Sequence, residues 1–253
     1  MTSQSTAKKP KLTSGSWLGL SIQLLVLLAL IAAVFIYLAV ADLSPTEAST
    51  LAPSSLAKLT LQHIKLTLVA TAIVLAIAIP LGVVLTRKPL RFLTGPVLAV
   101  ANIGQAAPAI GLVVLLAMWM DFGFWPAVVA LVVYAVLPVL RNTMAGLDGV
   151  DRRLIEAGRG MGMSSLAVLF RVELPLAVPV MLAGIRTALV LLVGTATLAT
   201  FIDGGGLGLL ITSGVNLSQT TILVVGAVVV ALLALVIDWM GRVVEHVARP
   251  KGL

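Results

Sequence analysis

The chain has 253 residues, of which 60% are hydrophobic and 11% charged, and its mean hydropathy is +1.13. Soluble domains carry about 25% charged residues, so this composition excludes a water-soluble enzyme, and most of the surface must contact lipid. The chain lacks cysteine and has two histidines, and its net charge of +7 falls in short blocks, which excludes thiolate metal sites and argues against a nucleic-acid partner.

Six long apolar runs predict six transmembrane helices. An α-helix rises ~1.5 Å per residue, so about 20 residues cross the ~30 Å hydrocarbon core of a bilayer. Apart from Asp238 at the end of the last run, Arg186 is the one charged residue inside these runs. The expected fold class is an all-α polytopic membrane protein with spans at residues 17–41, 66–86, 95–120, 122–140, 180–202 and 220–238.

The basic residues predict how these spans are oriented. Cytoplasmic loops of membrane proteins retain an excess of Lys and Arg. Fourteen of the seventeen Lys and Arg residues lie before the first span, between spans 2 and 3, between spans 4 and 5, or after the last span, whereas Lys58 and Lys65 lie on the opposite side. We therefore expect both termini in the cytoplasm, with a disordered tail at residues 1–16 and a second tail at residues 243–253.

The first span is predicted to remain as an anchor. The basic residues that precede it and the sequence Ala39-Val40-Ala41 resemble a signal peptide. However, its apolar run of 25 residues exceeds the roughly 7–15 apolar residues of such a peptide. Residues 42–65 are then expected to form an outer linker with two prolines, in which Ser54 caps a short helix that leads into the second span.

The third span carries amides and helix breakers inside an apolar run. Asn102, Gly104, Gln105 and Pro108 occur within seven residues, and polar amides in hydrocarbon are costly unless they contact protein or a wet cavity. One interpretation is a broken segment in which Asn102 and Gln105 form the polar wall of a translocation pathway. The other is that both amides bond to neighbouring backbone groups and hold helices together.

The inner segment at residues 141–173 is too polar to enter the membrane and too long for a simple turn. Asp151 is a plausible N-cap, and an apolar stripe follows at helical spacing, formed by Leu154, Ile155, Gly158 and Met161. Gly160 and Gly162 are expected to end this helix, and Ser164 to cap a second helix that ends before Leu174. A short helix held outside the membrane suits a groove on a soluble partner, and an amphipathic helix lying on anionic lipid is the alternative.

The fifth span contains the remaining candidate pathway residues. A cation at the centre of a bilayer costs about 2.5 kcal/mol or more. Arg186 is therefore expected about one turn inside the membrane, either extending towards the cytoplasm or contacting a substrate. Thr195 and Thr197 follow Gly194, and small residues with hydroxyls suit close helix packing or a pore wall. Downstream, Gly204 to Gly208 predict a flexible outer loop.

The inner segment resembles a known motif. Glu156-Ala157-Gly158, then Gly162, then Val172-Glu173-Leu174-Pro175 match the spacing of the EAA motif of ABC importer permeases, with Gly158 and Val172 in place of alanine and isoleucine. The resemblance implies a type I ABC importer permease fold over residues 57–242. It also implies a cytoplasmic coupling helix that docks in a cleft of an ATPase subunit through Glu156, Ala157, Gly158, Gly162, Leu174 and Pro175.

A narrower resemblance covers roughly residues 63–243. The segments at residues 160–163, 172–176, 182–187 and 194–199 are similar to permeases of glycine betaine, carnitine, choline and proline importers. This implies a multi-pass protein of the bacterial inner membrane. Its implied partners are a cytoplasmic ABC ATPase, an extracytoplasmic substrate-binding protein, and a second permease copy or a paralogue.

The absence of an ATP-binding motif agrees with ATP hydrolysis on a separate subunit. The sequence has no G-x-x-x-x-G-K-[ST] phosphate loop, so this chain is expected to bind no cofactor and ATP to be used by the partner. The alternative functions are an ABC permease for another small solute, such as an amino acid or a sulfonate, and an ion-coupled secondary carrier. The four aspartates expected at helix ends, Asp42, Asp121, Asp203 and Asp238, argue against the carrier.

Overall fold

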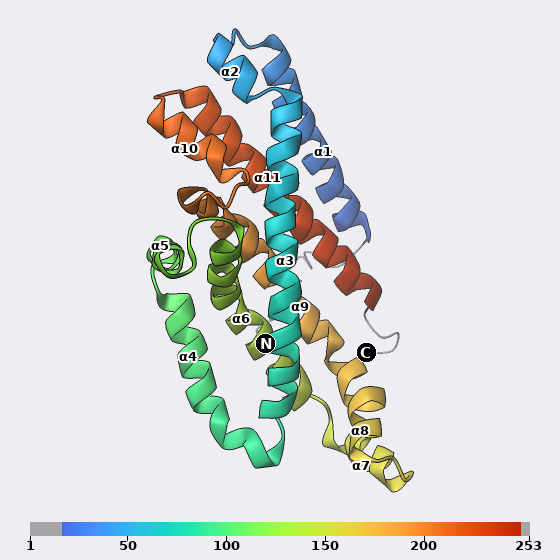
Figure 1. Cartoon of the computed structure of the whole chain (residues 1–253). Helices are drawn as coiled ribbons and strands as arrows, with labels where there is room; N and C mark the ends of the chain where they lie inside the picture. The colour runs from blue at the N-terminus through green and yellow to red at the C-terminus, as the bar shows by residue number, and fades with distance from the viewer. Residues whose placement is uncertain (1–16, 249–253) are drawn as a thin grey trace, which may run out of the picture.

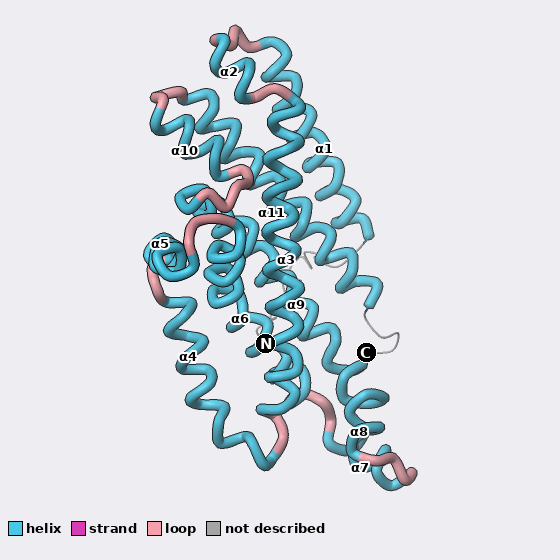
Figure 2. Tube along the Cα trace, viewed as in Figure 1, coloured by secondary structure: helices cyan, strands magenta, loops and turns pink. Residues whose placement is uncertain are grey.

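The computed structural model describes residues 17–248, and the tail predicted at residues 1–16 lies outside the described residues. Every regular element of the described part is helical (Figure 2). In chain order the helices are α1 (Trp17–Val40), α2 (Pro45–Thr50), α3 (Pro53–Leu85), η1 (Lys88–Leu93), α4 (Thr94–Ala106), α5 (Ala109–Met120), α6 (Phe124–Asp148), α7 (Arg152–Gly160), α8 (Ser165–Val168), η2 (Leu169–Glu173), α9 (Leu174–Thr195), η3 (Ala196–Ile202), α10 (Gly208–Asn216) and α11 (Thr220–Ala248).

The helices match the expected membrane architecture. Within residues 17–248, five helices are long and apolar enough to cross a membrane, namely α1, α3, α6, the helix at residues 165–202, and α11. The helices at residues 88–106 and 109–120 are bent by 97° at Ala107 and Pro108, and they give a sixth span if the pair counts as one. The helix α7 and the short α8 lie at one end of the body, and α2 and α10 lie at the other (Figure 1).

The centre of the molecule is formed by α3, α6 and α9. On α3, the residues Leu66, Ala70, Val74 and Ala78 are completely buried, and their spacing of four residues places them on one face. They pack in the same cluster as buried residues of α6 and α9, including Val139 and Leu192. Nine of the 21 buried residues of this cluster are alanines, and small side chains let helix backbones approach closely in a membrane.

Two glycines set how closely α6 approaches its neighbours. A Cβ atom at Gly82 of α3 would lie 2.7 Å from the Thr143 side chain of α6, and one at Gly146 of α6 would lie 3.0 Å from the Ala177 carbonyl oxygen of α9. Neither contact leaves room for a larger residue. The packing of α6 against both neighbours therefore depends on glycine.

Helix α1 is peripheral. Only Leu20 and Leu27 of its residues are buried. It packs along α11, where the indole nitrogen of Trp239 donates a hydrogen bond of 2.9 Å to the Leu20 carbonyl oxygen and Trp17 meets His246 edge to face. The expected anchor is thus joined to the body mainly through α11.

The outer linker expected at residues 42–65 is mostly helical. Helix α3 begins at Pro53 with Ala52 as its N-cap, so the prediction that Ser54 caps this helix is wrong. Proline at the first helical position has no N–H group to satisfy, which explains the earlier start. Ser44 instead caps α2 in a reciprocal pair of hydrogen bonds with Glu47. A hydrogen bond from the Thr221 side chain, together with those from Ser44, lowers the pKa of Glu47.

Two helices continue beyond the ends of the predicted spans. Helix α6 continues to Asp148, so Arg141 lies within a helix and not in the inner segment. Helix α11 continues to Ala248, so Asp238 lies well inside it, and part of the tail predicted at residues 243–253 is helical. Charged residues ended both sequence-based spans, yet an α-helix readily extends beyond the hydrocarbon core because its backbone hydrogen bonds are internal.

Candidate functional site

The inner segment folds as its local signals predict. Asp151 caps α7, and its carboxylate accepts a hydrogen bond of 2.9 Å from the Arg153 backbone N–H. Helix α7 ends at Gly160, and Gly162 follows with a φ of +82°. Ser164 then caps α8 by accepting a hydrogen bond from the Ala167 N–H. These caps produce two short helices joined by a sharp turn.

The two glycines of the EAA-like motif have different roles. Gly158 is buried against Val168, Met163 and Val172, where an added Cβ would make ordinary contacts of 3.5 to 3.7 Å. The alanine of the motif would therefore fit at this position. At Gly162 an added Cβ would meet open space, so the left-handed backbone and not packing requires glycine there.

The surface of this segment carries several large exposed apolar side chains. Glu156 and Ala157 are exposed on α7. Large apolar side chains are exposed on α7, its turn and the following helix, with exposed fractions of 47% for Leu154, 72% for Met161, 68% for Leu166 and 65% for Phe170. An exposed apolar patch with a charged border is typical of an interaction surface.

The segment leads without interruption into the body. The second helix was predicted to end before Leu174, but α8, the π-helical turn η2 and α9 follow one another with no intervening loop. Pro175 lies in the first turn of α9, where its missing N–H has no cost. Leu174 and Pro175 thus belong to a helix that connects the inner segment rigidly to the packed centre.

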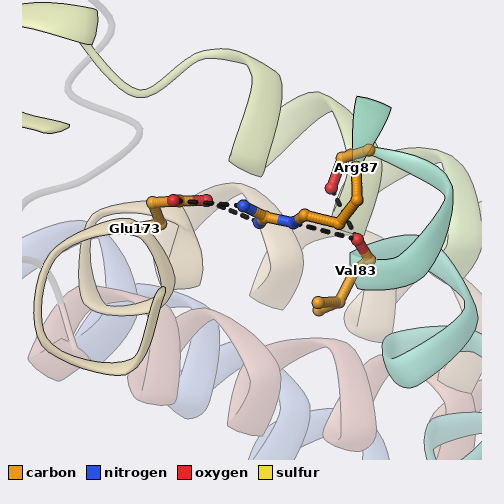
Figure 3. Close-up of polar contacts among 4 residues, drawn as sticks. Val83, Arg87 and Glu173 are labelled. Atoms are coloured by element: carbon orange, nitrogen blue, oxygen red, sulfur yellow. Dashed lines mark hydrogen bonds and ion pairs between the residues drawn. The ribbon is translucent and has the colours of Figure 1, made fainter. Parts of the chain in front are cut away.

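A partly buried ion pair holds the segment against the end of α3, as Figure 3 shows. Both guanidinium Nη atoms of Arg87 donate to the Glu173 carboxylate, at 3.1 and 2.5 Å, and Arg87 Nε donates to the Val83 carbonyl oxygen at 3.3 Å. The Glu173 side chain is 6% exposed and that of Arg87 is 35% exposed. A bidentate pair of this kind fixes orientation as well as distance.

A polar cavity of about 400 Å³ lies beside this pair, between η1 and α7. Arg87, Arg91 and Asp148 line one side, and Arg152 and Glu156 line the other. Arg91 and Asp148 form an exposed ion pair at 3.6 Å. Glu173 of η2 also lines this cavity, so the contact of the inner segment with the end of α3 runs through its ion pair with Arg87.

The two amides of the third predicted span lie next to α6. Asn102 donates to the Leu98 carbonyl oxygen and accepts a hydrogen bond of 2.8 Å from Arg141. Gln105 donates to the Tyr134 carbonyl oxygen at 3.3 Å. The Tyr134 hydroxyl in turn donates to the Ala107 carbonyl oxygen at the 97° bend. The segment is broken and its amides bond to a neighbouring helix, so features of both interpretations occur together.

Of the candidate residues of the fifth span, Thr195 lines a small cavity together with Tyr134, whereas Arg186 is bound elsewhere. Arg186 lies between Asp238 and Glu245 of α11, at 3.6 Å from each carboxylate. Thr195 and Thr197 donate to carbonyl oxygens within their own helical segment, at Leu191 and Gly194. Arg186 is thus paired to acidic residues of α11, a partnership that the spacing of the sequence did not indicate.

The glycine-rich outer loop is held firmly on α3. The Leu207 N–H donates to His63 Nδ1 at 3.2 Å, which assigns the proton to Nε2, and Nε2 donates to the Val193 carbonyl oxygen at 2.9 Å. The Gln62 side chain accepts a hydrogen bond from the Gly206 N–H. Gly205 and Gly206 have positive φ values, so glycine serves a defined turn here and not only flexibility.

Sequence reasoning missed Arg87, Glu173, Arg141 and Tyr134 as site residues. Glu173 belongs to the motif, but its partner lies 86 residues away, and no local pattern indicates that contact. Arg141 was assigned to a loop because a charge ended the apolar run. Tyr134 carried no signal beyond its hydroxyl.

Comparisons with known proteins agree with the motif. The family model described as binding-protein-dependent transport system inner membrane component matches residues 78–249. The chain is 43% identical over 192 residues to the glycine betaine/carnitine/choline transport system permease protein of Bacillus subtilis, covering 76% of this chain and 88% of that protein. It is 44% identical over 194 residues to the choline transport system permease protein of the same organism, covering 77% and 88%.

A relative from another organism and a solved structure extend these matches. The osmoprotectant import permease protein OsmW of Salmonella typhimurium is 40% identical over 203 residues, covering 78% of this chain and 94% of that protein. An inward-facing structure of the MetNI methionine ABC transporter has a TM-score of 0.67 at 24% identity, covering 77% of this chain and 96% of that chain. At this identity the structural match concerns the fold alone.

Proposed function

Since the chain belongs to the family of binding-protein-dependent transport system inner membrane components, we propose that it is the permease subunit of an ATP-driven ABC importer for quaternary-amine osmoprotectants such as glycine betaine or choline. The observation that carries this proposal is an identity of 43–44% to permeases of such systems over three quarters of the chain. The chain is a multi-pass membrane protein, and we infer that it lies in the bacterial inner membrane with both termini in the cytoplasm.

The division of labour follows from the surface of the inner segment. We infer that a separate ATPase subunit receives α7 and the exposed Leu154 and Met161 in a cleft, and that ATP is hydrolysed there. An extracytoplasmic binding protein delivers the solute at the opposite end of the bundle. A second permease copy or a paralogue completes the pathway, because one chain encloses too little to form a channel.

Alternating access explains how hydrolysis drives import. Closure of two ATPase subunits would move two α7 helices together. Helix α9 would carry that motion directly into the packed centre, because no loop separates it from η2 and α8. The ion pair between Arg87 and Glu173 supports simultaneous movement of α3. The permease itself makes and breaks no covalent bond.

Reconstitution tests the proposed function. The permease, ATPase and binding protein in proteoliposomes are expected to accumulate radiolabelled glycine betaine and choline when ATP is inside, and the permease alone is expected to transport neither. Uptake of methionine or taurine in place of quaternary amines would be consistent with an ABC importer but would refute the proposed solute class. Uptake by the permease alone under an ion gradient would favour a secondary carrier.

Replacing Gly162 with valine is expected to lower copurification of the ATPase by about tenfold. A left-handed conformation costs L-residues roughly 1–2 kcal/mol, and Gly162 has a φ of +82°, so the turn after α7 would be displaced. Glu156→Ala is expected to weaken the same association by removing an exposed carboxylate. Pull-down from solubilised membranes and ATP-driven uptake measure both effects.

The matched control is Gly160→Ala. Gly160 ends α7, and an added Cβ would meet no atom within 4 Å, so association is expected to be unchanged. The proposed docking role would be refuted if Gly162→Val and Glu156→Ala left both ATPase association and uptake at the level of the native protein.

A further inference from the structure

Arg141 directly follows the apolar run of α6 and forms no ion pair within residues 17–248. It lies about two turns before the end of α6. Within residues 17–248, Arg186 is paired with two carboxylates, whereas Arg141 forms no ion pair. A cation at the border of a span that no carboxylate neutralises is a candidate for contact with a charged solute. Arg141 therefore needs a functional explanation.

The contact of Arg141 with Asn102 holds the guanidinium in a defined position. Arg141 Nη2 donates a hydrogen bond of 2.8 Å to Asn102 Oδ1. The amide nitrogen of Asn102 donates to the Leu98 carbonyl oxygen at 2.7 Å, which directs the amide oxygen towards Arg141. In the described part of the chain no other residue accepts a hydrogen bond from this guanidinium, and the side chain is exposed.

A positioned guanidinium with unused N–H groups is suited to a carboxylate. Its planar fork matches the two oxygens of a carboxylate, and such charge-assisted bonds are about twice as strong as neutral ones. An alkylammonium group, by contrast, is repelled by Arg141. The side chain can therefore distinguish solutes that carry a carboxylate from solutes that carry only a positive charge.

Arg141 continues the polar group formed by α4 and α6. Tyr134 lies two turns earlier on α6, roughly 10 Å along the helix, and donates to the Ala107 carbonyl oxygen at the bend. Gln105 lies between the two levels and bonds to the Tyr134 backbone. The polar groups thus extend from the break between α4 and α5 towards the cytoplasmic end, where an imported solute must leave.

We propose that Arg141, held by Asn102, is a carboxylate-binding subsite of the translocation pathway, and that it makes the pathway favour zwitterionic betaines over the cation choline. The inference rests on the proposed function and refines it, because both solute classes are quaternary amines. Glycine betaine and carnitine carry the carboxylate that the subsite binds, whereas choline carries a hydroxyl.

The test compares solutes in the reconstituted complex of permease, ATPase and binding protein. With saturating amounts of binding protein loaded with each solute, Arg141→Gln is expected to lower the rate of glycine betaine uptake at least about tenfold relative to that of choline. Arg141→Lys retains the positive charge without the planar guanidinium and is expected to change the ratio of the two uptake rates less. Asn102→Leu retains the guanidinium without its support and is also expected to shift the ratio less.

A second measurement removes the influence of the binding protein. Radiolabelled glycine betaine and choline are bound to the ATP-free permease–ATPase complex alone, and Arg141→Gln is expected to weaken binding of glycine betaine only. Lys88→Gln, which removes an exposed cation of η1, is the matched control. It is expected to leave the ratio of glycine betaine to choline unchanged in both the uptake and the binding measurement.

The outcomes separate the two proposals. Equal losses for both solutes, or an unchanged ratio in Arg141→Gln, would overturn the subsite and leave the importer intact. Absence of ATP-driven uptake of either quaternary amine by the native complex would overturn the proposed solute class together with the subsite that depends on it.

Discussion

Replacing Glu173 with glutamine is expected to lower ATP-driven uptake about tenfold or more while the protein still inserts in the membrane. Arg87 would lose its carboxylate, and Glu173 contributes the buried half of this pair. Breaking a buried pair costs about 3–5 kcal/mol and an exposed one up to about 1 kcal/mol. Because Arg87 is partly exposed, we expect about 1–3 kcal/mol, between these limits.

The effect is expected in coupling more than in folding. The pair joins the end of α3 to the end of the inner segment, so its loss should let α7 move without moving α3. ATP hydrolysis per solute transported is therefore expected to rise in Glu173→Gln. Uptake and phosphate release, measured in the same proteoliposomes, give this ratio.

Two further variants make the test specific. The double exchange Arg87→Glu with Glu173→Arg is expected to recover part of the uptake, because opposite charges again face each other. Asp148→Asn, which breaks the exposed pair with Arg91 nearby, is expected to have little effect. Equal effects of Asp148→Asn and Glu173→Gln would argue against a special role of the partly buried pair.

Replacing Gly208 with alanine is expected to reduce the yield of folded protein severely. An added Cβ would overlap the backbone carbonyl group of Thr197, and a backbone group cannot rotate away as a side chain can. Overpacking in a core typically costs about 1–3 kcal/mol, with larger values where relaxation is blocked. The outer loop would have to move, together with its hydrogen bonds to Gln62 and His63.

The matched control is Gly194→Ala in α9. An added Cβ there would meet no atom within 4 Å, and alanine favours the helix over glycine by about 1 kcal/mol. Monodisperse yield on size exclusion and the unfolding temperature in detergent are the readouts. Similar behaviour of the two variants would show that the contact at Gly208 relaxes at low cost.

Much of the structure of the inner segment was predictable because its helix caps and its turn depend on residues close together in the sequence. Asp151 and Ser164 satisfy backbone N–H groups two or three residues away, and Gly162 supplies a backbone conformation that other residues rarely adopt. The motif spacing depends on the same local geometry. The roles of Glu156, Ala157 and Gly158 in docking remain predictions, since they concern a partner subunit.

The ends of the helices were less predictable. Apolar runs locate the part of a helix that contacts lipid, but α3, α6 and α11 extend into polar sequence because helices need no lipid to persist. The break in the third span was expected from Pro108, whereas its angle of 97° depends on how α5 packs against α6.

The sequence by itself determined a helical membrane protein, its approximate spans and the caps of its inner segment, because hydropathy and capping act over a few residues. Only the tertiary structure decided that Arg87 binds Glu173, that Arg141 binds Asn102 and that Arg186 lies between two carboxylates of α11. These contacts join residues that are 39 to 86 positions apart. They depend on the packing of helix against helix, which small residues such as Gly82 and Gly146 permit and no local pattern specifies.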